Sequence, residues 1–362
     1  MRLCLAAAIL TLAGACSGND TITNAPAAPV PPPAPATLDF SAAMDAVDAA
    51  PIANMALIVG DETGVVFTYE KGVFPTDAPI RVASASKLIV GLAMRLLVVD
   101  GTLALDDQPQ DYISYWADNE PAGRSAVSLA SLMAFTSGFE NPPRQPGCIG
   151  DGAVLLFDCV RQIHDGGLDR APGAAFSYGP EHMQIAALMA AEARGRPFTL
   201  LVRDLLFDPL GVSADAAFPI LGGDNPRFSG ALTMRSDDYA LILTALLAGD
   251  LVSDLPEFLR DGVQDAAVAF RPPSTEQFNA DWRYGFGFWK ECDLPAYDAT
   301  CEAEQIISSP GGFGFTPWVD FVNGYWAIIA MEEIALTTAQ PTPESVALEQ
   351  ALQPILVEAL SP

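Results

Sequence analysis

The stretch IRVASASKLIVGLAMRLLVVDGTLALDD, from Ile80 to Asp107, is the most informative segment for predicting the fold of this chain of 362 residues. Apolar residues recur at helical spacing after Ser84, at Leu88, Leu92, Leu96 and Val99. The pair Asp100-Gly101 then ends the pattern, as glycine commonly does just after a helix. The stretch therefore predicts an apolar helix that begins at Ser84.

Ser84 and Lys87 lie three residues apart on this predicted helix, so both side chains share one face. A serine hydroxyl is a weak nucleophile until a base removes its proton. A neutral lysine amine one turn away can be that base if burial lowers its pKa. Ser-x-x-Lys is a short and common pattern, but lysine occurs only three times in this chain, which makes its position here more informative.

Segments on both sides of the helix predict one antiparallel sheet built from the two ends of the chain. The expected strands are Asn54–Val59, Gly64–Glu70, Trp282–Trp289, Gln305–Ser309, Thr316–Val322 and Tyr325–Met331. Helices over Phe40–Ala50 and Pro343–Leu360 are expected to cover the sheet. A mostly helical region from about residue 100 to 275 is inserted between the strands. The predicted fold class is thus α/β (α+β), with an antiparallel sheet flanked by helices.

Seven motifs in order resemble the serine β-lactamase and penicillin-binding-protein superfamily, in its class C-like branch with esterases, D-aminopeptidases and amide hydrolases. Besides Ser84-x-x-Lys87 they are Gly101–Asp107, Leu132–Gly138, Pro172–Tyr178, Asp208–Val212, Ser229–Asp238 and Tyr284–Trp289. The resemblance covers about residues 40 to 335, and Phe135 stands where the branch usually has histidine. It implies a β-lactamase/transpeptidase-like fold and a serine hydrolase that works through an acyl-enzyme.

The resemblance also gives Tyr178 a role, because the branch places a tyrosine phenol beside the serine. Such a phenol can act as base and return a proton to the leaving group if the positive charge of Lys87 lowers its pKa. The branch has asparagine two residues after the tyrosine, whereas this chain has Pro180. The serine, lysine and tyrosine are therefore present, and one amide that contacts substrate is missing.

The third motif of the branch, Lys-Thr-Gly or His-x-Gly, is represented here by Ser309-Pro310-Gly311. In this register the Gly312 N–H joins the Ser84 N–H in an oxyanion hole. A second register places Gly312-Phe313-Gly314 there, with Phe315 N–H as donor, and a simple turn between strands is a third interpretation. None of these supplies the lysine or histidine of the branch.

The altered motifs favour a neutral ester or amide substrate over β-lactams, because two polar contacts to substrate are lost. One alternative is a β-lactamase or a D-amino-acid peptidase acting on cell-wall-type substrates. Another is a catalytically impaired envelope binding protein with the same fold. The sequence does not indicate an oligomeric state.

The N-terminus resembles a bacterial lipoprotein signal over residues 1–16, with Arg2 before the apolar run Leu3–Ala15 and Cys16 as the lipidated residue. Plain secretory cleavage nearby is the alternative. Residues 17–37 form a Pro/Ala-rich linker before a domain over 38–362. An exported protein is expected, periplasmic or anchored to the outer membrane, with membrane contact only through a lipid anchor.

Six cysteines occur, and four of them form two local pairs, Cys148 with Cys159 and Cys292 with Cys301, read as disulfides. The net charge of −27 argues against nucleic-acid binding. No phosphate-binding loop and no His/Asp/Glu cluster is present in the sequence, so no cofactor and no metal site is predicted. The two histidines, His164 and His182, are read as surface or packing residues, because no Gly-x-Ser-x-Gly elbow accompanies them.

Overall fold

The computed structural model describes residues 38–117, 121–139, 147–260, 267–270, 282–292, 294, 297–333 and 341–361. The predicted signal peptide with Cys16, and the linker over 17–37, lie outside the described residues. No described helix is long and apolar enough to cross a membrane.

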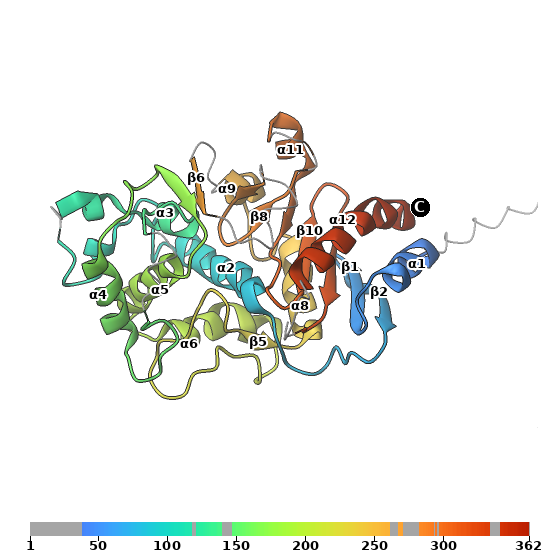
Figure 1. Ribbon diagram of the computed structural model, residues 1–362, viewed down its shortest axis with the longest axis horizontal. Coiled ribbons are helices and arrows are strands. Elements are labelled where there is room, and N and C mark those ends of the chain that lie inside the picture. Colours follow the sequence, from blue (N-terminus) through green and yellow to red (C-terminus); the bar gives the residue numbers. More distant parts are fainter. Residues whose placement is uncertain are drawn as a thin grey trace, which may run out of the picture. The chain divides into compact units, whose positions relative to one another are not determined.

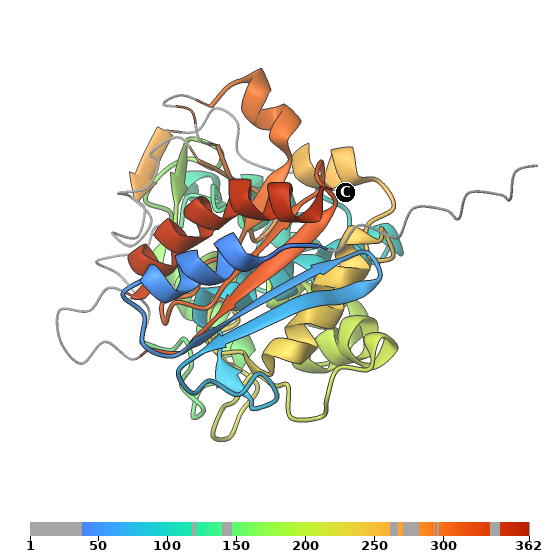
Figure 2. The ribbon, with the colours of Figure 1, turned by 90° about the vertical axis from the view of Figure 1, so that its right-hand side faces the viewer.

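Seven strands of the described part form one antiparallel sheet in the order β2-β1-β11-β10-β9-β8-β7 (Figures 1 and 2). Their bounds are β1 Met55–Asp61, β2 Gly64–Lys71, β7 Arg283–Tyr284, β8 Trp289–Lys290, β9 Ile306–Ser308, β10 Thr316–Asp320 and β11 Tyr325–Ala330. Strand β1 pairs with β11, with Ala56 opposite Ala330. The prediction of one sheet made from both ends of the chain is confirmed.

The two faces of the sheet belong to two different apolar cores, because side chains alternate along each strand. In β1, Met55, Leu57 and Val59 face one core, whereas Ala56 and Ile58 face the other. Helices α1 (Ser41–Ala49) and α12 (Pro341–Leu360) run side by side over the first face (Figure 2). Apolar residues of α2 (Ser86–Val99) and α8 (Ser236–Leu247) belong to the second core.

The region between β2 and β7 is mainly helical and holds α2 at its centre (Figure 1). Its other helices are α3 Leu129–Met133, α4 Leu156–Gly166, α5 Glu181–Arg194, α6 Phe198–Val202, α7 Asp208–Leu210 and α9 Leu255–Arg260. It also contains β3 (Ile80–Arg81) paired with β5 (Thr233–Met234), and β4 (Ala175–Ser177) paired in parallel with β6 (Ala267–Phe270), which the sequence did not indicate.

One predicted strand was wrong in its extent. Trp282–Trp289 is not continuous but splits into β7 and β8, joined by a tight turn in which Gly285 N–H donates to the Phe288 carbonyl at 2.8 Å. The split lets the chain reverse and add two short strands to the sheet edge.

Both predicted disulfides are confirmed, Cys148–Cys159 and Cys292–Cys301. The first joins the segment before α4 to α4 itself, and the second joins the segment after β8 to α11 (Ala299–Glu304). Each closes a short local loop, so each restricts the unfolded chain within a single region.

Candidate active site

Ser84 lies in a 3-10 turn, Ala83–Ala85, that leads directly into α2. The sequence predicted a helix from Ser84, and the regular α-helix starts two residues later, at Ser86. The preceding residue, Ala83, has φ of 47°, in the left-handed region that is unfavourable for a residue with a Cβ. Such strain persists only where neighbouring contacts hold it, and it clusters at functional sites.

Those contacts come from a segment far along the chain. Ser86 Oγ donates to the Ala83 carbonyl at 2.5 Å and accepts the Leu232 N–H at 3.1 Å. Tyr239 Oη in α8 donates to the Ala85 carbonyl at 3.0 Å. The turn that presents Ser84 is therefore fixed by buried hydrogen bonds on both sides.

Lys87 is 3% exposed, and its Nζ lies 3.0 Å from Ser84 Oγ and 2.6 Å from the Ser229 carbonyl. Burial holds the pKa of Lys87 well below its usual value, and the charge of Arg227 lowers that pKa further. A neutral amine can donate one hydrogen to the Ser229 carbonyl and turn its lone pair toward the Ser84 hydroxyl. The local burial that the sequence argument required is present.

Tyr178 follows β4, and Lys87 Nζ lies 4.5 Å from the centre of its ring. The ring stacks on Trp289 with 5.5 Å between centroids and 10° between planes. Burial raises the pKa of the Tyr178 phenol, although a hydrogen bond with Ser84 opposes the rise. The expectation that Lys87 lowers the pKa of Tyr178 is therefore wrong, because desolvation of the buried phenol raises it. Burial thus favours the uncharged form of both side chains.

The segment after β9 runs beside Ser84. Ser309 Oγ donates to the Ser84 carbonyl at 3.1 Å. Gly311 N–H is used inside the hairpin, where it donates to the Phe315 carbonyl at 2.7 Å. A Cβ on Gly311 would come within 2.3 Å of the Val82 carbonyl, so glycine allows the segment to approach the Ser84 turn. Gly312, which is exposed, lies at the end of this approach.

A cavity of about 240 Å³ joins these groups. Its lining residues are Ala83, Ser84, Lys87, Tyr178, Gly179, Pro180, Arg227, Ser229, Gly230, Gly312 and Phe313. Of the residues singled out from the sequence, Ser84, Lys87, Tyr178 and Gly312 meet here, while Ser309 contacts Ser84 from behind. Phe315, the donor of the second register, is fully buried and does not line the cavity.

The histidines lie elsewhere, as expected from the sequence. His182 is fully buried, with Nδ1 2.8 Å from Ser137 Oγ and Nε2 2.9 Å from the Ser177 carbonyl. Burial lowers the pKa of His182 to about 4, so it stays neutral. His182 stacks on Phe135 with centroids 4.6 Å apart, so it packs behind Tyr178 and does not reach Ser84.

Two charged residues in this region, Arg227 and Glu181, were not predicted from the sequence. Arg227 lines the cavity. Glu181, the first residue of α5, is 2% exposed, and neither of its carboxylate oxygens has a hydrogen-bond partner of good geometry among the described residues. Burial raises the pKa of Glu181 to about 7, although its own backbone N–H and the charge of Arg227 oppose the rise. Arg227 reaches the cavity, and its charge acts on buried Glu181, only through tertiary structure, which no local sequence pattern reveals.

We expect Glu181→Gln to stabilise the protein relative to wild type by an amount that grows as the pH rises from about 4.5 to about 7. In this window the unfolded glutamate ionises while the folded one keeps its proton, so wild type loses stability as pH increases. The raised pKa of Glu181 corresponds to a loss of wild-type stability on the order of 3 kcal/mol across this pH window. Urea unfolding of both proteins at pH 5 and pH 8 measures the gap, with exposed Glu62→Gln as control. An equal gap at the two pH values contradicts the expectation.

The sheet, the inserted helical region and a serine-lysine pair at the head of the central helix define the class of β-lactamase/transpeptidase-like proteins. The chain belongs to the Beta-lactamase family, whose model matches residues 40–347. The resemblance inferred from the sequence is thereby confirmed.

Individual relatives are distant. The chain is 27% identical over 140 residues to the D-alanyl-D-alanine-carboxypeptidase/endopeptidase AmpH of Escherichia coli, a match that covers 38% of this chain and 36% of AmpH. The chain matches less than half the length of such curated relatives. A "putative beta-lactamase" of Bacteroides dorei has a TM-score of 0.72 at 25% identity, covering 89% of this chain and 100% of that one. The D-amino acid amidase of Ochrobactrum anthropi has a TM-score of 0.64 at 17% identity, covering 89% and 100%, and shares the fold.

Proposed function

We propose that this protein is a serine hydrolase that cleaves ester or amide bonds through an acyl-enzyme on Ser84. The observation that carries the proposal is the 3.0 Å contact between Ser84 Oγ and Lys87 Nζ, with burial lowering the pKa of Lys87 and both residues lining one cavity. A neutral amine in hydrogen-bond reach of a serine hydroxyl is the arrangement that general-base activation requires.

In the first half of the reaction, Ser84 Oγ attacks the substrate carbonyl as its proton passes to Lys87 Nζ. The backbone N–H groups of Ser84 and Gly312 face the developing oxyanion. When the bond to the leaving group breaks, the Tyr178 hydroxyl gives that group a proton and is reprotonated by the Lys87 ammonium. Water then attacks the acyl carbonyl, its proton passes to Lys87, and the Ser84 oxygen leaves with a proton returned from Lys87.

Two features support ester or amide substrates over β-lactams. Pro180 lines the cavity and offers no side-chain hydrogen bond to substrate. Ser309 stands where the family has lysine or histidine, and its hydroxyl donates a hydrogen bond to the Ser84 carbonyl. Backbone N–H groups at Ser84 and Gly312 suffice to polarise an ester carbonyl.

We also propose that the protein is exported and lipidated at Cys16, in the periplasm or at the outer membrane. Two disulfides support an oxidising compartment, where such bonds persist. Metabolic labelling with a tagged fatty acid is expected to mark the native chain and not Cys16→Ser. Label retained in that variant contradicts lipidation at this residue.

The hydrolase proposal is tested with short-chain nitrophenyl esters, a chromogenic cephalosporin and a serine-reactive fluorophosphonate. Wild type is expected to hydrolyse the esters faster than the cephalosporin and to carry the phosphonate on Ser84, whereas Ser84→Ala does neither. Absence of both turnover and labelling favours the impaired binding protein. Cephalosporin turnover above ester turnover overturns the order of substrates.

A further inference from the structure

The cavity contains a second basic side chain besides Lys87. Arg227 lines its wall beside Ser229 and Gly230 and is partly exposed. Among the described residues its guanidinium has no hydrogen bond and no ion pair. Several arginines of the same part of the chain do have carboxylate partners, namely Arg81, Arg95, Arg161, Arg194, Arg196, Arg203 and Arg235. A cation without such a partner is unusual in a chain with 45 acidic residues.

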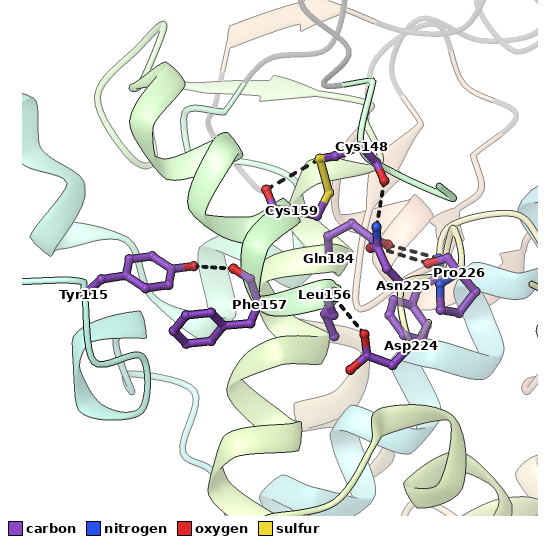
Figure 3. The surroundings of a disulfide bond; sticks show 10 residues. Tyr115, Cys148, Leu156, Phe157, Cys159, Gln184, Asp224, Asn225 and Pro226 are labelled. Atoms are coloured by element: carbon purple, nitrogen blue, oxygen red, sulfur yellow. Dashed lines mark hydrogen bonds between the residues drawn. A yellow bond between two sulfur atoms is a disulfide. The ribbon is translucent and has the colours of Figure 1, made fainter. Parts of the chain in front are cut away.

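The backbone on both sides of Arg227 is fixed by a buried glutamine. Gln184 in α5 donates to Asn225 Oδ1 at 2.8 Å and to the Pro226 carbonyl at 3.1 Å (Figure 3). Its Oε1 accepts the Phe228 N–H at 3.1 Å. Gln184 is fully buried. Arg227 thus lies between two restrained neighbours, although no hydrogen bond or ion pair to a described residue fixes its guanidinium.

The first disulfide extends this support. Asn225 Nδ2 donates to the Cys148 carbonyl at 2.6 Å, and Cys148 is bonded to Cys159 in α4 (Figure 3). Asp224 Oδ1 accepts the Leu156 N–H at 2.8 Å at the start of the same helix. A group held in this way can bind a ligand with a small loss of conformational freedom in its backbone.

The charge of Arg227 reaches the reacting groups, because it contributes to the lowered pKa of Lys87. A substrate whose carbonyl lies at Ser84 therefore lies within the same field. A guanidinium presents a planar fork of N–H donors that matches a carboxylate, and such charged pairs are among the stronger hydrogen bonds.

We infer that Arg227 selects substrates that carry a carboxylate near the bond to be cleaved, an inference that rests on the hydrolase function proposed above. This replaces the expectation of a neutral substrate, which rested on the altered second and third motifs. Arg227 comes from the segment between α7 and β5. The cavity therefore still contains an anion-binding group, although the third motif beside β9 has no lysine or histidine.

Two matched ester pairs test the inference and locate the carboxylate. The acyl pair is 4-nitrophenyl hydrogen glutarate and its methyl ester. The leaving-group pair is 4-carboxyphenyl butyrate and its methyl ester. In wild type the ratio of kcat/KM, anionic over neutral, is expected to exceed one for one pair, and Arg227→Met is expected to lower that ratio at least tenfold. The pair that responds tells which side of the scissile bond carries the carboxylate.

Arg227 also affects the pKa of Lys87, and comparing ratios within each ester pair cancels this effect. Its loss raises the pKa of Lys87 and so moves the acid limb of every pH profile, but this acts equally on both members of a pair. Arg227→Lys keeps the charge and is expected to retain most of the preference, whereas Arg227→Glu reverses it. Exposed Arg161→Met, on α4, is the matched control and leaves the ratio unchanged. Ratios that agree within twofold between wild type and Arg227→Met in both pairs overturn the inference.

A failure of the hydrolase proposal can be distinguished from a failure of the inference about Arg227. If wild type turns over none of the four esters, calorimetric titration with each pair still decides the role of Arg227. Tighter binding of an anionic member, lost in Arg227→Met, supports it even in an inactive protein. Equal binding of anionic and neutral members overturns it.

Discussion

Lys87→Met is expected to lower kcat/KM for ester hydrolysis by a factor of about 10² to 10⁴, the usual contribution of a positioned base. Methionine fills a similar volume but has no lone pair basic enough to accept the Ser84 proton. The amine that is lost lies 3.0 Å from Ser84 Oγ, so no water needs to mediate the transfer in wild type. Initial rates with a nitrophenyl ester measure the loss.

Lys87→Arg is the matched control, since it keeps a long basic side chain that stays protonated at any accessible pH. We expect it to be as inactive as Lys87→Met, because the mechanism needs a neutral amine and not a positive charge. If the arginine variant retained wild-type activity, Lys87 would act only through its charge and the base assignment would be wrong.

Lys87→Met is expected to lower activity but to raise the stability of the folded protein. Burial lowers the pKa of Lys87 in the folded protein, so the unfolded chain binds its proton more tightly. Wild-type stability therefore rises with pH between the lowered pKa and 10.5. We expect Lys87→Met to be more stable than wild type at neutral pH, with an advantage that shrinks as pH approaches 10. A gap that does not change over this range indicates that Lys87 is charged in the folded state.

Gly91→Ala is expected to destabilise the fold by about 2 kcal/mol or more, although alanine is the better helix former by about 1 kcal/mol. A Cβ on Gly91 would lie 1.9 Å from the Phe286 carbonyl oxygen and 2.9 Å from its carbon, both backbone atoms. Helix α2 and the turn between β7 and β8 must then separate. Because Trp289 follows this turn and stacks on Tyr178, activity is expected to fall as well.

Gly166→Ala provides the comparison, because Gly166 is also helical, at the end of α4, and a Cβ there meets no atom within 4 Å. It is expected to leave the unfolding free energy unchanged or slightly higher. Denaturant unfolding of the two variants separates the effect of the close contact from the effect of helix propensity. Equal stability of the two variants contradicts the described approach of α2 to the turn.

The parts of this protein that the sequence predicted correctly depend on local spacing. The short apolar run Asn54–Val59 predicted a strand where β1 lies, and the three-residue interval of Ser84 and Lys87 places both on one helical turn. The two disulfides join cysteines close in sequence. In each case the partners are near neighbours, so the pattern alone carries the geometry.

The parts that sequence reasoning missed depend on contacts between distant segments. The pKa of Tyr178 is raised by burial, to which distant residues such as Trp289 contribute and which its own motif does not encode. Arg227 lines the cavity in a segment that Gln184, from α5, holds on both sides. The continuous strand expected over Trp282–Trp289 is broken because Gly285–Phe288 closes a turn.

The pairing of β1 with β11 also sets an order of events during synthesis. Strand β1 is made near the start of the domain, but its neighbour Tyr325–Ala330 is among the last elements to be made. Pairings between distant segments form slowly, because a long loop must close first. A growing chain therefore cannot complete the sheet against which α2 packs before the final strand arrives. Such a delay is compatible with the export proposed above, and it postpones complete packing of α2 until the whole domain has been made.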